Sequence, residues 1–299
     1  MSYHNPVLLQ ESVDGMEIKG DEVVVDVTFG GGGHSKEILS RLGKKGKLFG
    51  FDQDEDAVQN SIDDARFVLV KQNFRYLKNY LKLYKVIPVD AVLADLGVSS
   101  HQFDEGSRGF SIRFEGPLDM RMNKNGKLTA AQVVNEYDEK KLLWIFRNYG
   151  EVNNAKRLVE ELMSYRAGTK ITTTQQLIEI AQTCVPGKMR NKYLAQVFQA
   201  LRIEVNDEMN ALRELLEQSY EVLKPGGRLS VITYHSLEDR LVKNFIKSGK
   251  FEGEVEKDFF GNPQLKFKAV NRKPITPSEE ELQLNNRARS AKLRIAEKI

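Results

Sequence analysis

The apolar residues in the first third of the chain fall into short runs rich in Val, Leu and Phe, separated by helix-length segments of mixed polarity. The runs predict strands at 21–29, 47–54, 66–74 and 89–97. Helices are predicted between them at 35–43, 55–65 and 75–85. Strands that alternate with helices indicate βαβ units, so we expect a parallel sheet with right-handed crossovers.

The alternation stops after residue 106, and helical patterns then dominate to about residue 223. They lie at 129–150, 153–168, 172–184 and 196–223. LKPGG at 223–227 predicts a turn, 228–236 a fifth strand and 236–249 a helix. Two final strands are expected at 265–270 and 291–297, joined by a surface loop at 271–289.

The simplest architecture is one doubly wound α/β domain interrupted by a helical insertion. We expect the α/β domain at 1–106 and 206–299, and an inserted all-helical domain at 107–205, after strand four. The insertion is the expected substrate-recognition module.

Composition narrows the class of protein. A hydrophobic content of 40% and a charged content of 29% are those of a soluble globular chain. No apolar stretch is long enough for a bilayer, and the N-terminus has no secretory pattern, so a cytoplasmic location is expected. Cys184 is the only cysteine, which leaves no disulfide framework or thiolate metal cluster, and no metal is expected. The net charge of +3 does not by itself predict nucleic-acid binding.

Four glycines, Gly30 to Gly33, follow the first strand and precede a helix. Ligands of open α/β sheets bind at the carboxyl ends of the strands, where the helix start offers free N–H groups. Asp52, after the second strand, has the spacing of an acceptor for ribose hydroxyls, with a helix cap as the alternative. Phe74, after the third strand, suits an adenine face, with core packing as the alternative. Their joint placement predicts a nucleoside-containing cofactor.

The glycine run does not decide which cofactor binds. No P-loop string is present, and Ser35 occupies the third glycine position of a dinucleotide fingerprint. Asp95 ends the fourth strand, and Gly97 permits a sharp turn after it. This position faces the reactive end of a cofactor bound at strand one, although a capping or solvated aspartate is the alternative.

Longer strings carry a more specific signal. YHNPVLL, TFGGGGHS, DLGVSSHQFD, GPLDMRM, FQALRIEVN, LKPGGRL, HSLEDR and NRARSAKLRIAE follow one another in that order. In these strings the chain resembles the RsmH (MraW) family along essentially its whole length. The resemblance implies a class I, Rossmann-like methyltransferase that uses S-adenosylmethionine. It also implies methylation of the exocyclic N4 of a cytidine near the decoding centre of 16S rRNA in the small ribosomal subunit.

The resemblance also implies site residues. The cofactor-binding residues of the family fall on Gly32, Gly33, His34, Asp52, Phe74, Asp95 and Gln102. The chain departs from the family near 191–196, which leaves substrate contacts there open. The protein is expected to be a monomer or a homodimer, away from any membrane.

A cytosine amine attacks poorly because its lone pair is shared with the ring, so the enzyme must hold it in line and accept its N–H groups. Asp95 and His235 are the candidate catalytic residues, with a structural role as the alternative for His235. The base must leave any stack, which requires backbone contacts. Candidate phosphate contacts, each with a solvated surface role as the alternative, are Arg108, Arg121, Lys188, Arg190 and Lys192.

Three other functions remain open at this stage. An NAD-linked oxidoreductase would use the same glycine loop and Asp52, but it wants a third close glycine. A non-enzymatic RNA-binding factor would tolerate the loss of Asp52 and Asp95, and both are present. A methyltransferase acting on DNA or protein is the third.

Overall fold

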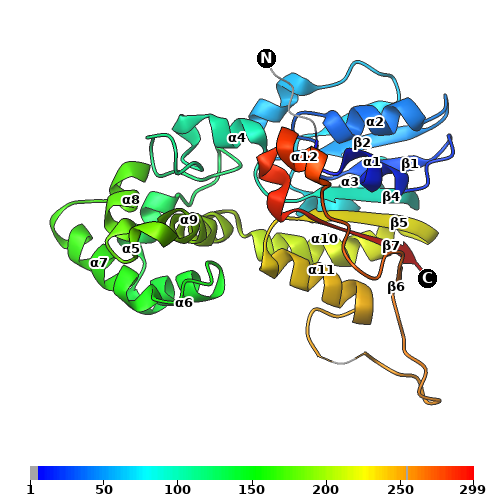
Figure 1. The fold of residues 1–299 in the computed structure, drawn as a ribbon. Helices are drawn as coiled ribbons and strands as arrows, with labels where there is room; N and C mark the ends of the chain where they lie inside the picture. The colour runs from blue at the N-terminus through cyan, green and yellow to red at the C-terminus, as the bar shows by residue number, and fades with distance from the viewer. Residues whose placement is uncertain (1–5, 254) are drawn as a thin grey trace. The chain divides into compact units, whose positions relative to one another are not determined.

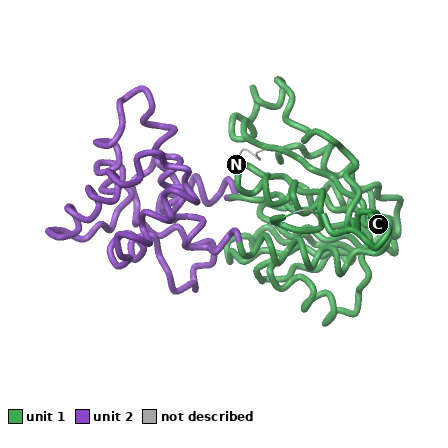
Figure 2. The backbone as a smooth tube through the Cα atoms, turned by 90° about the horizontal axis from the view of Figure 1, so that it is seen from below, with its two compact units in different colours: residues 1–97, 210–299 green, residues 98–209 purple. Residues whose placement is uncertain are grey.

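The computed structural model describes residues 6–253 and 255–299. Residues 3–5, which begin the string YHNPVLL, lie outside this range. The chain divides into two compact units, residues 1–97 with 210–299 and residues 98–209 (Figure 2). The insertion thus begins two residues after Asp95, nine residues earlier than the sequence pattern placed it. No helix in the described part of the chain is long and apolar enough to cross a membrane.

The first unit is built on a sheet of seven described strands in the order β3-β2-β1-β4-β5-β7-β6 (Figure 1). The strands are β1 Val23–Asp26, β2 Lys47–Phe51, β3 Phe67–Val70, β4 Val89–Asp95, β5 Leu223–Thr233, β6 Phe267–Ala269 and β7 Lys292–Lys298. Strands β1 to β5 pair in parallel, and β7 is antiparallel to β5 and β6. The strand order reverses between β1 and β4, so the doubly wound prediction is confirmed and its switch point is located.

Helices cover both faces of this sheet (Figure 1). They are α1 Leu9–Asp14, α2 Gly33–Arg41, α3 Leu77–Leu83, α10 Glu208–Val222, α11 Ser236–Ser248 and α12 Glu279–Leu284, with 3₁₀ helices η1 Glu55–Asn60, η2 Phe74–Tyr76 and η5 Asn286–Ser290. The central strands are buried on both sides, which explains why they read as continuous apolar runs.

Three local predictions were wrong. The helix expected at 55–65 is only a 3₁₀ helix to Asn60, because Asp64 accepts the backbone N–H of Arg66 and favours a turn. The turn at 223–227 is an irregular part of β5, where pairing jumps from Leu223 to Arg228 and Gly226 has a φ of 76°. The loop at 271–289 contains α12, whose Ser278 side chain caps the N–H of Glu281.

The second unit, whose residues are all described, contains helices as its only regular elements. They are α4 Ser100–Asp104, α5 Ala130–Glu136, α6 Glu139–Asn148, α7 Ala155–Gly168, α8 Thr174–Gln182 and α9 Arg190–Asn206, with η3 Gly106–Arg108 and η4 Gly187–Met189. Their apolar faces enclose a core of their own, which includes Phe146, Leu158 and Leu177. The helical stretch expected at 196–223 is two helices, separated at Asp207, where φ is 51°.

Candidate functional site

The glycine run at the end of β1 has two physical reasons to be glycine. Gly30 and Gly32 adopt positive φ angles of 51° and 75°, which side chains rarely adopt. A Cβ on Gly33, the first residue of α2, would collide with the ring of Pro6. Gly31 differs, since a Cβ there would meet nothing within 4 Å. The backbone at Gly31 is therefore open to a ligand.

Asp26 holds this loop in place, and the sequence reasoning did not single it out. Its Oδ2 accepts a 2.7 Å hydrogen bond from the Ser35 hydroxyl, and its Oδ1 accepts the N–H of Thr28 at 3.1 Å. Burial raises the pKa of the Asp26 carboxyl. Ser35 thus serves the loop with a hydroxyl where a dinucleotide fingerprint has glycine. A carboxylate that directly ends a buried strand was the available signal.

Asp52 connects the ends of β1 and β2. Its Oδ2 accepts the N–H of Gly30 and its Oδ1 accepts the N–H of Asp54, both at 2.8 Å. The cap of η1 is Asp54, which accepts the N–H of Asp56, so the helix-cap alternative for Asp52 does not hold. Burial raises the pKa of Asp52 to about 6. Each carboxylate oxygen keeps a lone pair for a further donor such as a ligand hydroxyl.

Phe74 lies just beyond β3 as the first residue of η2, and its side chain is only half-buried. The Asn73 side chain caps this turn by accepting the N–H of Arg75. The Asn73 amide also donates to Gln53 Oε1 at 2.9 Å, which couples the ends of β3 and β2. A half-exposed ring at this edge differs from ordinary core packing.

Asp95 lies at the end of β4, beside the switch point. The Tyr234 hydroxyl donates to its Oδ1 at 2.7 Å, and its backbone N–H donates to Thr28 Oγ1 at 2.7 Å. Burial raises the pKa of Asp95 to about 6, although the nearby His34 and the Tyr234 hydrogen bond oppose this shift. Burial and the adjacent Asp95 raise the pKa of Tyr234 well above its usual value, so its hydroxyl remains a donor.

His34, in the first turn of α2, is buried between the N-terminal segment and Asp95. Its Nε2 lies 3.1 Å from the carbonyl oxygen of Val7, and its Nδ1 lies 3.9 Å from Asp95 Oδ2. A carbonyl only accepts, so Nε2 carries the proton in this contact. The helix start thus brings a third element to Asp95. Sequence reasoning without the family resemblance gave no reason to select His34.

His235 has a structural task at the start of α11. Its Nδ1 accepts the N–H of Glu238 at 3.4 Å, and the Glu238 carboxylate accepts the N–H groups of Tyr234 and His235. This is a reciprocal capping box. The His235 ring is buried, with its Nε2 3.1 Å from Glu238 Oε1. The geometry therefore supports the structural alternative, and the catalytic role remains a prediction.

Gln102 belongs to the second unit. Its side chain is buried and closes a capping box with Ser99: its Oε1 accepts the N–H of Ser99 at 3.1 Å, and its own N–H donates to Ser99 Oγ at 3.2 Å. These bonds fix the start of α4. A contact between Gln102 and a cofactor remains a prediction.

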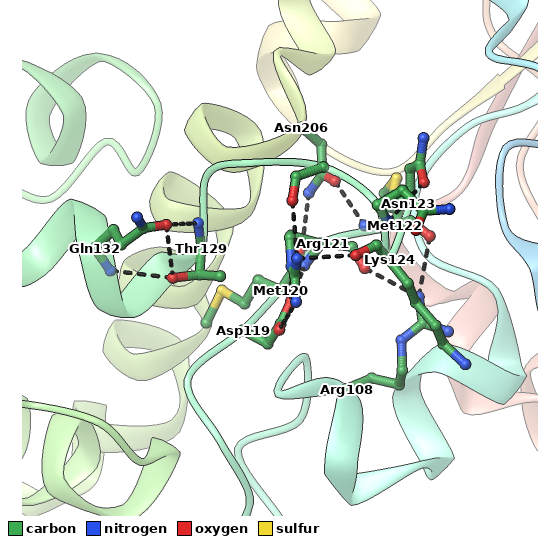
Figure 3. Close-up of polar contacts among 12 residues, drawn as sticks. Arg108, Asp119, Met120, Arg121, Met122, Asn123, Lys124, Thr129, Gln132 and Asn206 are labelled. Carbon is green, nitrogen blue, oxygen red and sulfur yellow. Dashed lines mark hydrogen bonds and ion pairs between the residues drawn. The ribbon is translucent and has the colours of Figure 1, made fainter.

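Two of the five arginines and lysines expected to contact phosphates hold a loop together instead (Figure 3). Arg108 is buried, and its guanidinium donates to the carbonyl oxygens of Arg121 and Met122 at 3.0 Å each. Arg121 forms a two-pronged ion pair with Asp119 and donates to two more carbonyl oxygens. The prediction that Arg108 contacts phosphate was wrong because its side chain is internal. Arg121 is committed to the same loop.

The other three lie on the surface. Lys188, Arg190 and Lys192 are exposed, around η4 and the first turn of α9. Their charges point to solvent from one short stretch, so this cluster retains the electrostatic character expected of a phosphate contact.

The glycine loop, Asp52 and Asp95 thus meet at the carboxyl edge of the sheet. The model of the MraW methylase family matches residues 1–299. The chain belongs to the MraW methylase family. Ribosomal RNA small subunit methyltransferase H of Flavobacterium johnsoniae is 59% identical over 299 residues, which are 100% of this chain and 99% of the relative. The protein of that name from Bacteroides thetaiotaomicron is 58% identical over 298 residues, 100% of this chain and 98% of the relative.

Solved structures add little. An rRNA methylase from Streptococcus thermophilus is 15% identical with a TM-score of 0.45, over 100% of this chain and 99% of the other, a likeness too low to carry an argument. This MraW methylase uses S-adenosylmethionine as its cofactor. The residues present fit that group: Asp52 keeps lone pairs for ribose hydroxyls, and the backbone at Gly31 is open beside it.

Proposed function

We propose that this methylase transfers a methyl group from S-adenosylmethionine to the exocyclic N4 of a cytidine in 16S rRNA of the small ribosomal subunit, near its decoding centre. The observation that supports this most strongly is the 59% identity, over nearly the full length of both chains, to a protein named ribosomal RNA small subunit methyltransferase H. The proposal implies that the protein acts in the cytoplasm.

The cofactor supplies a methyl group on a positively charged sulfur, so no metal is needed to activate it. The protein must position the weakly nucleophilic cytosine nitrogen in line with that methyl group. The rigid strand ends suit this task, because Asp26, Asp52 and Asp95 each hydrogen-bond to backbone groups at this edge.

The cofactor-binding residues each have a task in this proposal. Gly32 and Gly33 let the α2 start approach the ligand, and Asp52 accepts the two ribose hydroxyls. Phe74 covers the adenine face with its half-exposed ring. His34 and Gln102 complete the set that the family resemblance implies.

Asp95 binds the amino group of the cofactor in this proposal. Its Oδ1 is taken by Tyr234, whereas its Oδ2 has only His34 Nδ1 nearby, at 3.9 Å. With a pKa of about 6, the carboxyl is ionised at neutral pH and attracts an ammonium group. Many amino-methyltransferases carry a [DN]-P-P-[YFW] string here, and this chain has Asp95-Leu-Gly-Val. Loss of Asp95 would misplace the methyl group and abolish turnover.

The helical unit reads the RNA in this proposal. Lys188, Arg190 and Lys192 supply phosphate contacts from its surface. Such contacts compensate for the cost of extruding the target base from its stack.

The test uses labelled S-adenosylmethionine and purified small ribosomal subunits that lack the modification, followed by nucleoside mass spectrometry. We expect label in N4-methylcytidine with the wild-type protein and none with Asp95→Ala. Label in another nucleoside would overturn the target atom. Binding of NAD without binding of S-adenosylmethionine would favour an oxidoreductase instead. Cofactor binding without label would favour a different substrate or a non-enzymatic role.

A further inference from the structure

Two adjacent phenylalanines project from the loop that joins α11 to β6. Phe259 is 98% exposed and Phe260 is 85% exposed, more than any other large apolar side chain in the described residues. Their ring centroids lie 5.6 Å apart, and the ring planes are nearly perpendicular at 88°. The loop extends away from the sheet of the first unit (Figure 1). Exposed aromatic pairs of this kind mark interaction sites.

The turn that carries these rings is ordered by its own hydrogen bonds. Asp258 Oδ1 accepts the N–H groups of Phe260 and Asn262 at 2.9 and 2.8 Å. The Asn262 amide donates to Asp258 Oδ2 at 3.0 Å, and Gly261 has the positive φ, 85°, that closes the turn. A bridge between Lys257 and Pro263 supports the base of the turn. The two rings are thus presented to solvent without a need for ordering on binding.

The surface around the loop is basic. Residues 240–273 contain nine basic and four acidic side chains, a net charge of +5, whereas the whole chain carries +3. Arg240, Lys243 and Lys247 form an exposed stripe along α11, at the spacing of one helix face. The positive charge of this protein is therefore concentrated here.

A pocket of about 380 Å³ lies between α11 and the loop. It is lined by Asn244, Lys247, Ser248, Gly253, Val255 and Lys257. Two acidic groups of the loop are engaged within it, since Glu256 pairs with Lys250 at 2.6 Å and Asp258 accepts the hydrogen bonds of the turn. Two lysines and an amide beside one pocket suit an anionic ligand such as a phosphate.

We propose that α11 and residues 249–266 form a second RNA-binding surface, outside the methyl-transfer site. Phe259 and Phe260 stack on unpaired bases, while Lys243, Lys247 and Lys257 contact the adjoining phosphates. Aromatic faces beside a basic groove are what single-stranded RNA requires. The excess of positive charge favours RNA over an apolar protein partner. The inference rests on the proposed function, since it takes ribosomal RNA as the ligand.

The first experiment measures the binding of a labelled ten-nucleotide oligocytidine by fluorescence anisotropy. Phe259→Ala/Phe260→Ala should weaken binding at least tenfold, whereas Phe259→Trp/Phe260→Trp should retain it, because stacking needs a ring and not a particular residue. Leu284→Ala, which truncates an exposed apolar side chain in α12, is the matched control. Wild-type affinity in Phe259→Leu/Phe260→Leu would indicate apolar contact instead of stacking and would overturn the proposal.

The lysines are tested by the salt dependence of the same binding. Lys243→Ala/Lys247→Ala should reduce the slope of log affinity against log salt by about 1.4, as expected for two phosphate contacts on a single strand. Lys44→Ala/Lys45→Ala removes the same charge from an exposed turn after α2 and should leave the slope unchanged. Equal slopes in the two variants would contradict a specific phosphate contact at α11.

Methylation of small ribosomal subunits separates the two proposals. Phe259→Ala/Phe260→Ala should raise KM for the subunit about tenfold and leave kcat unchanged, because these residues lie outside the methyl-transfer site. An unchanged KM, with N4-methylcytidine formed by the wild type, would overturn the second surface alone. No N4-methylcytidine from the wild type, with oligocytidine binding still dependent on the two rings, would overturn the proposed function alone.

Discussion

The Tyr234 hydroxyl donates a 2.7 Å hydrogen bond to Asp95 Oδ1 and so joins the ends of two neighbouring strands, β5 and β4. This bond and the nearby His34 hold the pKa of Asp95 down against the effect of burial, which raises it to about 6. The activity of an enzyme that needs the Asp95 carboxylate falls as the pH drops through that pKa. The pair therefore sets the acidic limit of the reaction.

Tyr234→Phe should move that limit to higher pH. Removal of the donor raises the pKa of Asp95 by roughly half to one unit, since a hydrogen bond to a charged group stabilises the ionised form. The measurement is kcat/KM against pH for both proteins. Asp52 has a pKa of about 6 as well and is not bonded to Tyr234. An unmoved limit would therefore assign the titration to Asp52.

Asp52→Ala should weaken S-adenosylmethionine binding at least tenfold. A lost acceptor of two ribose hydroxyls costs about 1.4 kcal/mol or more. Calorimetric titration measures the change. Asn60→Ala is the control, because the Asn60 amide donates to the carbonyl oxygen of Gly30 and supports the same loop without a carboxylate. Equal losses in the two variants would mean that Asp52 acts only on the loop and would refute the ribose assignment.

His235→Asn distinguishes a capping histidine from a catalytic one. Asparagine is a good N-cap residue, so the variant should keep both the stability and the turnover of the wild type. His235→Ala should lose about 1 kcal/mol of stability as its cap disappears. Thermal unfolding and single-turnover methylation provide the two measurements. A stable but inactive His235→Asn would restore the catalytic prediction.

Arg108→Met should destabilise the helical unit by about 2 kcal/mol or more, because it removes a buried donor from two carbonyl oxygens. Trp144, the only tryptophan, lies in α6 of that unit and reports its unfolding by fluorescence in denaturant.

The exposed cluster should behave in the opposite way. Lys188→Ala/Arg190→Ala/Lys192→Ala should leave that unfolding curve unchanged and raise KM for the ribosomal subunit, because exposed cations contribute little to stability. A destabilised triple variant with an unchanged KM would remove the cluster from the RNA surface.

Much of the fold was predictable because buried parallel strands leave continuous apolar runs, as at β1 and β4. The errors lie where short polar side chains decide the local backbone. Asp64 ends the helical pattern after η1, and Ser278 begins a helix inside a segment rich in Pro and Glu. Such side chain to backbone bonds depend on geometry that periodicity does not contain.

The site was partly predictable for the same reason. Strand order places Asp52 and Asp95 at one edge of the sheet, and strand endings are visible in the sequence. The partners of these carboxylates are not visible, because Tyr234 is 139 positions from Asp95 and Val7 is 27 positions from His34. Charge alone also misled: Arg108 and Lys188 are both cations, yet one is internal and the other is exposed.

The loop of Figure 3 has a consequence for how proteins of this type diverge. The string GPLDMRM contains Asp119, Met120 and Arg121, and Asn206 from α9 binds the backbone of this loop at Met120 and Met122. All of these bonds lie within the helical unit, and none involves Asp52 or Asp95. A descendant that lost both carboxylates, and with them the reaction, would still need this string to fold. It would survive as a silent copy that carries the most distinctive letters of its ancestor without the ancestor's chemistry.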